Sequence, residues 1–219
     1  MLKYKCLILD HDDTVADSTR DLHHPAFLDA LNQLRPGHTV SLREYFLLNF
    51  DPGFLKYCTD VLHLSEEELQ RETDIWLSWT KRIIPTFYPG MVKIIRRQLE
   101  EGGIITVVSH SMAKNILRDY KANGLPEPTL VYGWERPPEE RKPEAFPVLQ
   151  ILEKLRLSPK EAIMIDDLKP GYDMARKCGV DFAAAGWAYD VPEIRAFMES
   201  QCENYFEKPE ELEAFLFGE

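Results

Sequence analysis

The sequence predicts a doubly wound α/β protein with a parallel sheet and a smaller all-helical domain inserted after the first strand. Three observations lead to this fold class. Short apolar runs alternate with amphipathic stretches, the apolar runs are continuous, and residues 18–85 contain no convincing buried strand. Continuous apolar runs are typical of strands covered on both faces, and strand–helix alternation predicts a parallel sheet.

The main domain is expected to contain strands at four apolar runs, with amphipathic helices between the later ones. Glycines stand where several of these helices should end. The expected strands are residues 6–9, 104–108, 162–165 and 182–185. The expected helices are residues 90–101, 112–123, 144–156 and 171–178, followed by a terminal amphipathic helix within 207–219 whose Leu212, Phe215 and Leu216 face the core.

The inserted region has helical spacing throughout and carries its own aromatic residues. The helical patterns cover residues 22–34, 42–48, 54–62 and 66–84. We therefore expect an α/β core domain made of residues 1–16 and 87–219, and a helical domain of residues 17–86.

The chain of 219 residues is acidic, with a formal net charge of −11 and 44% hydrophobic residues. Such a charge is repelled by nucleic acid and by anionic membranes, so neither is expected as the main partner. The four cysteines lack metal-site or disulfide-framework spacing. The apolar run before Asp10 is too short for a signal peptide, and no later segment is long enough to span a membrane, so a cytoplasmic protein is expected.

Polar residues follow three of the expected strands. The first strand leads into residues 10–14, the second into residues 109–111 and the third into Asp166 and Asp167, while Lys142 precedes the helix before that third strand. Ligands of such sheets bind beyond the carboxyl ends of the strands, so these side chains should converge. Each could alone be a turn or helix-capping residue. Their combination favours a site with a divalent cation, which would offset the repulsion among the acids.

Four segments in this order and spacing resemble the motifs of the haloacid dehalogenase-like (HAD) hydrolases. They are DHDDTV at residues 10–15, VVS at 107–109, KPEAF at 142–146 and IMIDD at 163–167. The resemblance runs through nearly the whole chain and includes a helical cap between the first and second motifs. It implies a Rossmann-like HAD core and a phosphatase-type member, similar to phosphoglycolate phosphatases and β-phosphoglucomutases.

The resemblance implies a role for each motif acid. Asp10 would be the nucleophile that forms an aspartyl-phosphate, and also a Mg²⁺ ligand. Asp12 would act as general acid and base, and its backbone carbonyl would bind the metal. Asp167 would bind the metal directly, and Asp166 would hold a metal-bound water.

Other residues are expected to contact the substrate. Ser109, His110 and Lys142 would bind the phosphate, with helix amides beside Ser109 contributing. His11 and His110 either touch the substrate or only fill the wall of the site, and the sequence leaves both alternatives open. The further candidates for substrate lining, besides His11, are Tyr45, Phe50 and Trp79.

The expected reaction is hydrolysis of a small phosphorylated metabolite. Asp12 argues against carbon–halogen or carbon–phosphorus cleavage, because relatives with those activities typically lack that acid. A sugar-phosphate mutase is the first alternative, but residues 43–52 contain one arginine and no clear clamp for a second phosphate. A non-catalytic phospho-ligand or partner-binding protein is another, and a response-regulator receiver fits the chain length and the Asp10–Asp12 spacing poorly. The sequence leaves open a monomer or a homodimer.

Overall fold

A computed structural model describes residues 2–218, which form two compact units. One unit contains the described residues up to Asp17 and from Thr86 onward, and the other contains Ser18–Pro85. Within the described residues, no helix is both long enough and apolar enough to cross a membrane.

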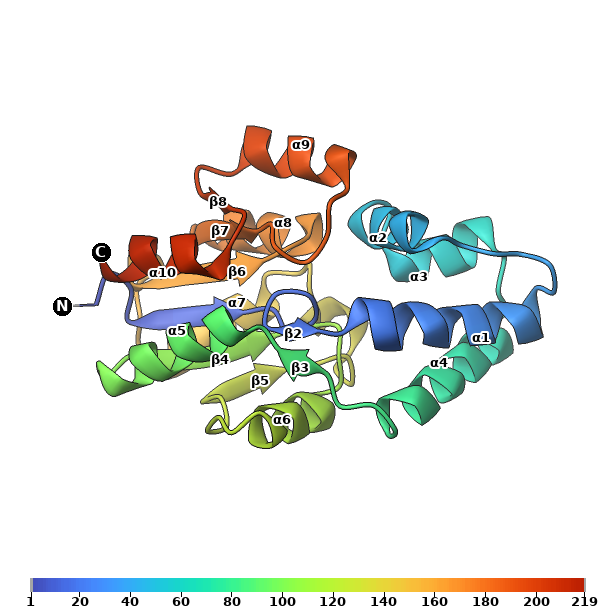
Figure 1. Cartoon of the computed structure of the whole chain (residues 1–219), viewed down its shortest axis with the longest axis horizontal. Helices are drawn as coiled ribbons and strands as arrows, with labels where there is room; N and C mark the ends of the chain where they lie inside the picture. Colours follow the sequence, from blue (N-terminus) through green and yellow to red (C-terminus); the bar gives the residue numbers. More distant parts are fainter. Residues whose placement is uncertain (1, 219) are drawn as a thin grey trace. The chain divides into compact units, whose positions relative to one another are not determined.

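The first unit is built on a parallel six-stranded sheet, which confirms the predicted fold class (Figure 1). The strand order is β5-β4-β1-β6-β7-β8, and all five pairings are parallel. Its strands are β1 (Cys6–Leu9), β4 (Ile104–Val108), β5 (Leu130–Tyr132), β6 (Ala162–Asp166), β7 (Asp181–Ala185) and β8 (Tyr205–Phe206). Four of these match the four predicted strands, whereas β5 and β8 were not predicted.

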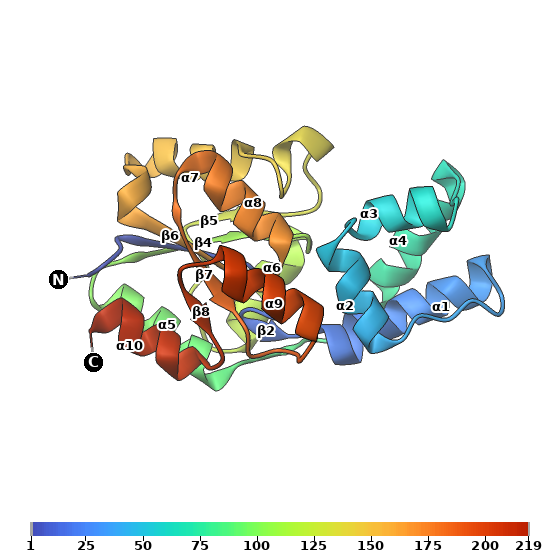
Figure 2. The ribbon, with the colours of Figure 1, turned by 90° about the horizontal axis from the view of Figure 1, so that it is seen from above.

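Helices cover both faces of this sheet, which explains why all four residues of β1 are buried. Figure 2 shows α5 and α10 on one side of the sheet and α7 and α8 on the other. The helices of this unit are α5 (Pro89–Glu100), α6 (Ala113–Ala122), α7 (Phe146–Leu155), α8 (Lys169–Cys178), α9 (Pro192–Gln201) and α10 (Pro209–Phe217), with short 3₁₀ turns at Pro138–Glu140 and Pro159–Glu161. Of these six α-helices, all except α9 were predicted.

The order of the strands places a switch point at β1. The chain passes from β1 to β4 and β5 on one side and then returns to β6 on the other. A crevice beyond the carboxyl ends of the strands is expected at such a point in an open α/β sheet. Asp10 directly follows β1, so it stands at the switch point.

A separate two-stranded ladder lies where the chain leaves and re-enters the first unit. Strands β2 (Ala16–Asp17) and β3 (Thr86–Phe87) pair antiparallel, with Ala16 opposite Phe87 and Asp17 opposite Thr86. The two strands belong to the same unit although 68 residues, Ser18–Pro85, separate them.

The second unit is helical, and local signals explain where its helices begin. Ser41 and Glu44 form a capping box before α2, and Ser65 and Glu68 form another before α4. The helices are α1 (His24–Leu34), α2 (Leu42–Phe50), α3 (Phe54–Lys56) and α4 (Glu66–Thr80), with π-helical turns at Thr19–His23 and Tyr57–Val61. Arg35 joins two of these helices through an ion pair with Glu68 at 2.5 Å.

The C-terminal helix α10 completes the core of the first unit as predicted. Leu212 is fully buried and Leu216 is 3% exposed, and Phe215 packs against the same apolar cluster at the edge of the core. The predicted segment extended to Glu219, which lies outside the described residues.

We expect Leu212→Ala to lower the free energy of unfolding by about 2–5 kcal/mol, because the truncation leaves a cavity in a packed core. The matched control is Leu149→Ala on α7, where the side chain is 51% exposed. That substitution should change stability by less than about 0.5 kcal/mol. Urea denaturation followed by circular dichroism measures both, and equal effects would contradict the assignment of α10 to the core.

Candidate active site

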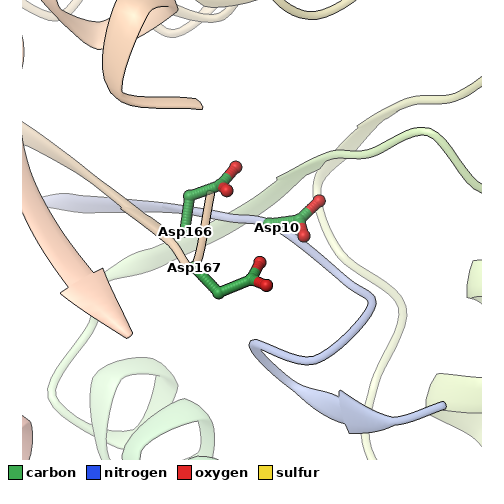
Figure 3. A group of neighbouring side chains, drawn as sticks. All are labelled: Asp10, Asp166 and Asp167. Atoms are coloured by element: carbon green, nitrogen blue, oxygen red, sulfur yellow. The ribbon is translucent and has the colours of Figure 1, made fainter. Parts of the chain in front are cut away.

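The three acids Asp10, Asp166 and Asp167 meet at the carboxyl ends of β1 and β6, as Figure 3 shows. One ligand oxygen from each lies within 4.8 Å of the other two. All three residues are at least 96% buried. The amide of Asp10 donates to the carbonyl of Ile165 at 2.9 Å, which continues the pairing of the two strands to this point. The sheet register therefore brings together residues that are more than 150 positions apart in the chain.

Lys142 bridges two of these acids. Its Nζ donates to Asp10 Oδ1 at 2.9 Å and to Asp166 Oδ2 at 2.8 Å. Burial lowers the pKa of Lys142, but the charges of Asp10 and Asp166 outweigh this effect and hold its pKa above the usual value. The ammonium group is therefore charged near pH 7.

One lysine does not neutralise three buried carboxylates. Burial raises the pKa of Asp166 to about 7, although Lys142 opposes the shift. Burial and the charges of Asp166 and Asp10 raise the pKa of Asp167 well above its usual range. This excess of negative charge among oxygen ligands fits a hard divalent cation such as Mg²⁺. Asp10 and Asp167 would hold the ion through their carboxylates.

The loop after β1 turns sharply below these acids. Asp13 has a φ of 59°, in the left-handed region that Asp tolerates better than most residues, and its amide donates to the carbonyl of Ala16 at 2.7 Å. Thr14 Oγ1 donates to Asp167 Oδ1 at 3.3 Å. Thr14 thus orients Asp167.

The fourth motif depends on a glycine. A Cβ atom on Gly171 would lie 2.1 Å from Asp166 Oδ2, so α8 packs this closely against the carboxylate only because residue 171 has no side chain. The amide of Leu168 donates to Asp166 Oδ1 at 2.9 Å. Both oxygens of Asp166 are therefore engaged by protein groups, which suits a residue that supports a site better than a direct metal ligand.

The residues expected to bind phosphate lie on the β4 side of the site. Ser109 is buried and its Oγ accepts a hydrogen bond from the amide of Ser111 at 3.1 Å. His110 Nε2 donates to the carbonyl of Lys142 at 2.8 Å. Burial and the charge of Lys142 lower the pKa of His110 to about 4, so this ring is neutral near pH 7. The amide of Ala113, at the N-terminus of α6, donates to the Glu135 carboxylate at 3.1 Å. In this structure a carboxylate of the chain therefore occupies a helix amide of the kind that was expected to contribute to phosphate binding.

Asp12 is held by a contact that the sequence did not reveal. Ser111 Oγ donates to Asp12 Oδ2 at 2.5 Å. Two aromatic residues after β7 also escaped prediction: Tyr189 donates to the carbonyl of Asp167 at 2.9 Å, and Trp187 donates to the carbonyl of Thr14 at 3.1 Å. Like the polar residues that follow the other strands, this aromatic pair follows the carboxyl end of β7, so its position in the sequence is a signal that identifies it.

The predicted lining residues have mixed surroundings. The His11 ring is 1% exposed, lies 3.2 Å from Asp119 and contacts the rings of Phe87 and Tyr120, which also contact each other. This environment favours the second alternative for His11, a structural role in the wall of the site.

The three candidates of the helical unit are described within that unit. Tyr45 is buried beside the rings of Phe27 and Phe54. Trp79 is half-buried and its Nε1 donates to Asp29 at 2.9 Å, and Phe50 is half-buried at the end of α2. Substrate contact by these residues stays a prediction.

Solved structures of low sequence identity share this fold. A haloacid dehalogenase-like family hydrolase from Streptococcus pneumoniae has a TM-score of 0.77 at 20% identity, over 97% of this chain and 98% of that one. A predicted phosphoglycolate phosphatase from Haemophilus somnus has a TM-score of 0.76 at 19% identity, over 97% of each chain. A mutant of CbbY from Rhodobacter sphaeroides, in complex with xylulose-(1,5)-bisphosphate, has a TM-score of 0.75 at 17% identity, over 95% of this chain and 96% of that one.

Sequence comparison gives the family. No curated protein matches the chain significantly. The family model for haloacid dehalogenase-like hydrolases matches residues 7–185, which include the site acids, Ser109 and Lys142. The chain therefore belongs to the haloacid dehalogenase-like hydrolase family.

Proposed function

We propose that this protein is a Mg²⁺-dependent phosphatase that hydrolyses a small phosphorylated metabolite through an aspartyl-phosphate on Asp10. The observation that carries the proposal is the buried group of Asp10, Asp166 and Asp167 with a single lysine. Membership of the family supports hydrolysis, and the sugar bisphosphate in the CbbY complex supports the substrate class.

The first step forms the phosphoenzyme. A carboxylate oxygen of Asp10 attacks phosphorus while the bond to the leaving oxygen breaks, and Asp12 gives that oxygen a proton. Lys142 and Ser109 bind the phosphoryl oxygens, whose negative charge otherwise repels the nucleophile. Bound Mg²⁺ would supply further positive charge at the same place.

The second step releases phosphate. Asp12, now a carboxylate, takes a proton from a water molecule, which attacks phosphorus and restores Asp10. Asp166 holds Lys142 in place throughout, because the ammonium group donates to both acids. The helical unit is proposed as the cap that selects the substrate, with Phe50 and Trp79 as candidate contacts.

We expect Asp10→Asn to abolish phosphate release from a panel of phosphorylated metabolites and 4-nitrophenyl phosphate, because the amide is not a nucleophile. Phosphate release is measured with and without added Mg²⁺. Asp60→Asn, at an exposed position of the helical unit, is the control and should retain activity. Full activity of Asp10→Asn would exclude the covalent mechanism, and binding without release by the unmodified protein would favour a non-catalytic function.

Asp12→Asn should lower kcat by roughly 10²–10⁴-fold, the usual contribution of a general acid and base. Binding should be little affected, since the substituted side chain has the same size. Steady-state kinetics measure both quantities. A loss smaller than about tenfold would mean that another group transfers the proton.

Added Mg²⁺ should raise the free energy of unfolding, by about 2.7 kcal/mol at a concentration 100 times its dissociation constant. Asp167→Asn should remove this gain and, without metal, should stabilise the protein near pH 7. Burial and the neighbouring acids raise the pKa of Asp167 in the folded chain, so folding must protonate a group that is ionised in the unfolded chain, and asparagine avoids this cost. Thermal unfolding of both proteins with Mg²⁺ or with a chelator measures the difference. An equal response to Mg²⁺ in the variant would contradict the assignment of Asp167 as a ligand.

A further inference from the structure

Ser111 touches two groups of the proposed active site at once. Its hydroxyl donates to Asp12 Oδ2 at 2.5 Å, and its backbone amide donates to Ser109 Oγ at 3.1 Å. The residue is 5% exposed. It therefore links the proposed general acid to the hydroxyl proposed to bind phosphate.

The segment after β5 holds the backbone of Ser111 through a hydrogen bond and a close contact. Its carbonyl accepts a hydrogen bond from the amide of Trp134 at 3.0 Å. A Cβ atom on Gly133 would lie 2.7 Å from that carbonyl oxygen and 2.6 Å from the amide nitrogen of Ala113. Only glycine permits this close approach. The backbone that carries the Ser111 hydroxyl therefore has little freedom to move.

Ser111 is the donor in both hydrogen bonds, to Ser109 and to Asp12. Ser109 Oγ accepts from an amide, so its own hydrogen is left for another acceptor, such as a phosphoryl oxygen. Asp12 accepts the hydroxyl hydrogen bond of Ser111 on Oδ2. A carboxylic acid protonated on the other oxygen can still accept this bond, so the contact is compatible with both protonation states that the reaction requires.

We propose that Ser111 is a positioning residue that aims the carboxyl group of Asp12 at the leaving oxygen. The proposal rests on the proposed phosphatase function. Asp12 is only half-buried, and it lies in the loop that turns at Asp13. A half-buried carboxyl group can occupy several rotamers, and the bond from Ser111 selects one of them. Geometric precision of this kind sustains general acid catalysis.

The test compares two esters that differ in their need for a general acid. Phenolate is a poorer leaving group than 4-nitrophenolate, so its departure depends more on a proton from Asp12. We measure kcat/KM, because it reports only the steps up to the first irreversible one and so omits hydrolysis of the phosphoenzyme. Ser111→Ala should lower kcat/KM by roughly tenfold or more on phenyl phosphate and by clearly less on 4-nitrophenyl phosphate.

Three variants separate this role from a general structural one. Ser111→Thr keeps a hydroxyl and should restore the rate on phenyl phosphate. Ser200→Ala removes an exposed serine of α9 and should leave both rates unchanged. Asp12→Asn should show the same preference between the esters as Ser111→Ala, but more strongly.

The outcomes distinguish the two proposals. If Asp12→Asn discriminates between the esters and Ser111→Ala lowers both rates equally or neither, the role of Ser111 is refuted while the phosphatase mechanism stands. If Asp12→Asn does not discriminate, the proposed role of Asp12 fails and that of Ser111 fails with it. Crystal structures of the unmodified protein and Ser111→Ala give a readout without turnover: an unmoved Asp12 side chain would overturn the inference, and a displaced one would support it.

Discussion

The bridge from Lys142 to Asp10 and Asp166 is the interaction on which the candidate site depends. A buried charge is costly unless its partners and hydrogen bonds are well placed. Here one ammonium group donates to two carboxylates that end neighbouring strands, so it fixes both acids at the same time. Asp167 is outside this bridge, and burial with the neighbouring acids raises its pKa well above the usual range despite the charge of Lys142. The cost of ionising Asp167 is the physical reason for expecting a cation.

The sheet supplies the rigidity that this arrangement requires. Strand β1 lies between β4 and β6, is buried along its whole length, and leads directly into Asp10. Side chains at the ends of packed strands have less freedom than side chains on exposed loops. The site therefore combines charged groups at the ends of packed strands with a loop that turns at Asp13 and carries Asp12 and Thr14.

The sequence predicted the elements with strong local signals and missed those without them. Long apolar runs revealed β1, β4, β6 and β7. Strand β5 has three residues and β8 has two, and neither is wholly buried, so their apolar runs are too short to predict a strand. These two strands form because they pair with the edges of the sheet. Their formation depends on tertiary contacts, which their own residues do not encode.

The same distinction applies to the site. The acids and Lys142 were found because each occupies a position that the order of strands and motifs defines. The contact of Ser111 with Asp12 joins two loops that are 99 positions apart, and no periodicity encodes it. The antiparallel ladder of β2 and β3 is another such long-range feature, and it has an evolutionary consequence. Because it keeps the two ends of the helical insertion adjacent within one unit, the insertion can diverge or be exchanged among descendants while the catalytic framework is inherited intact.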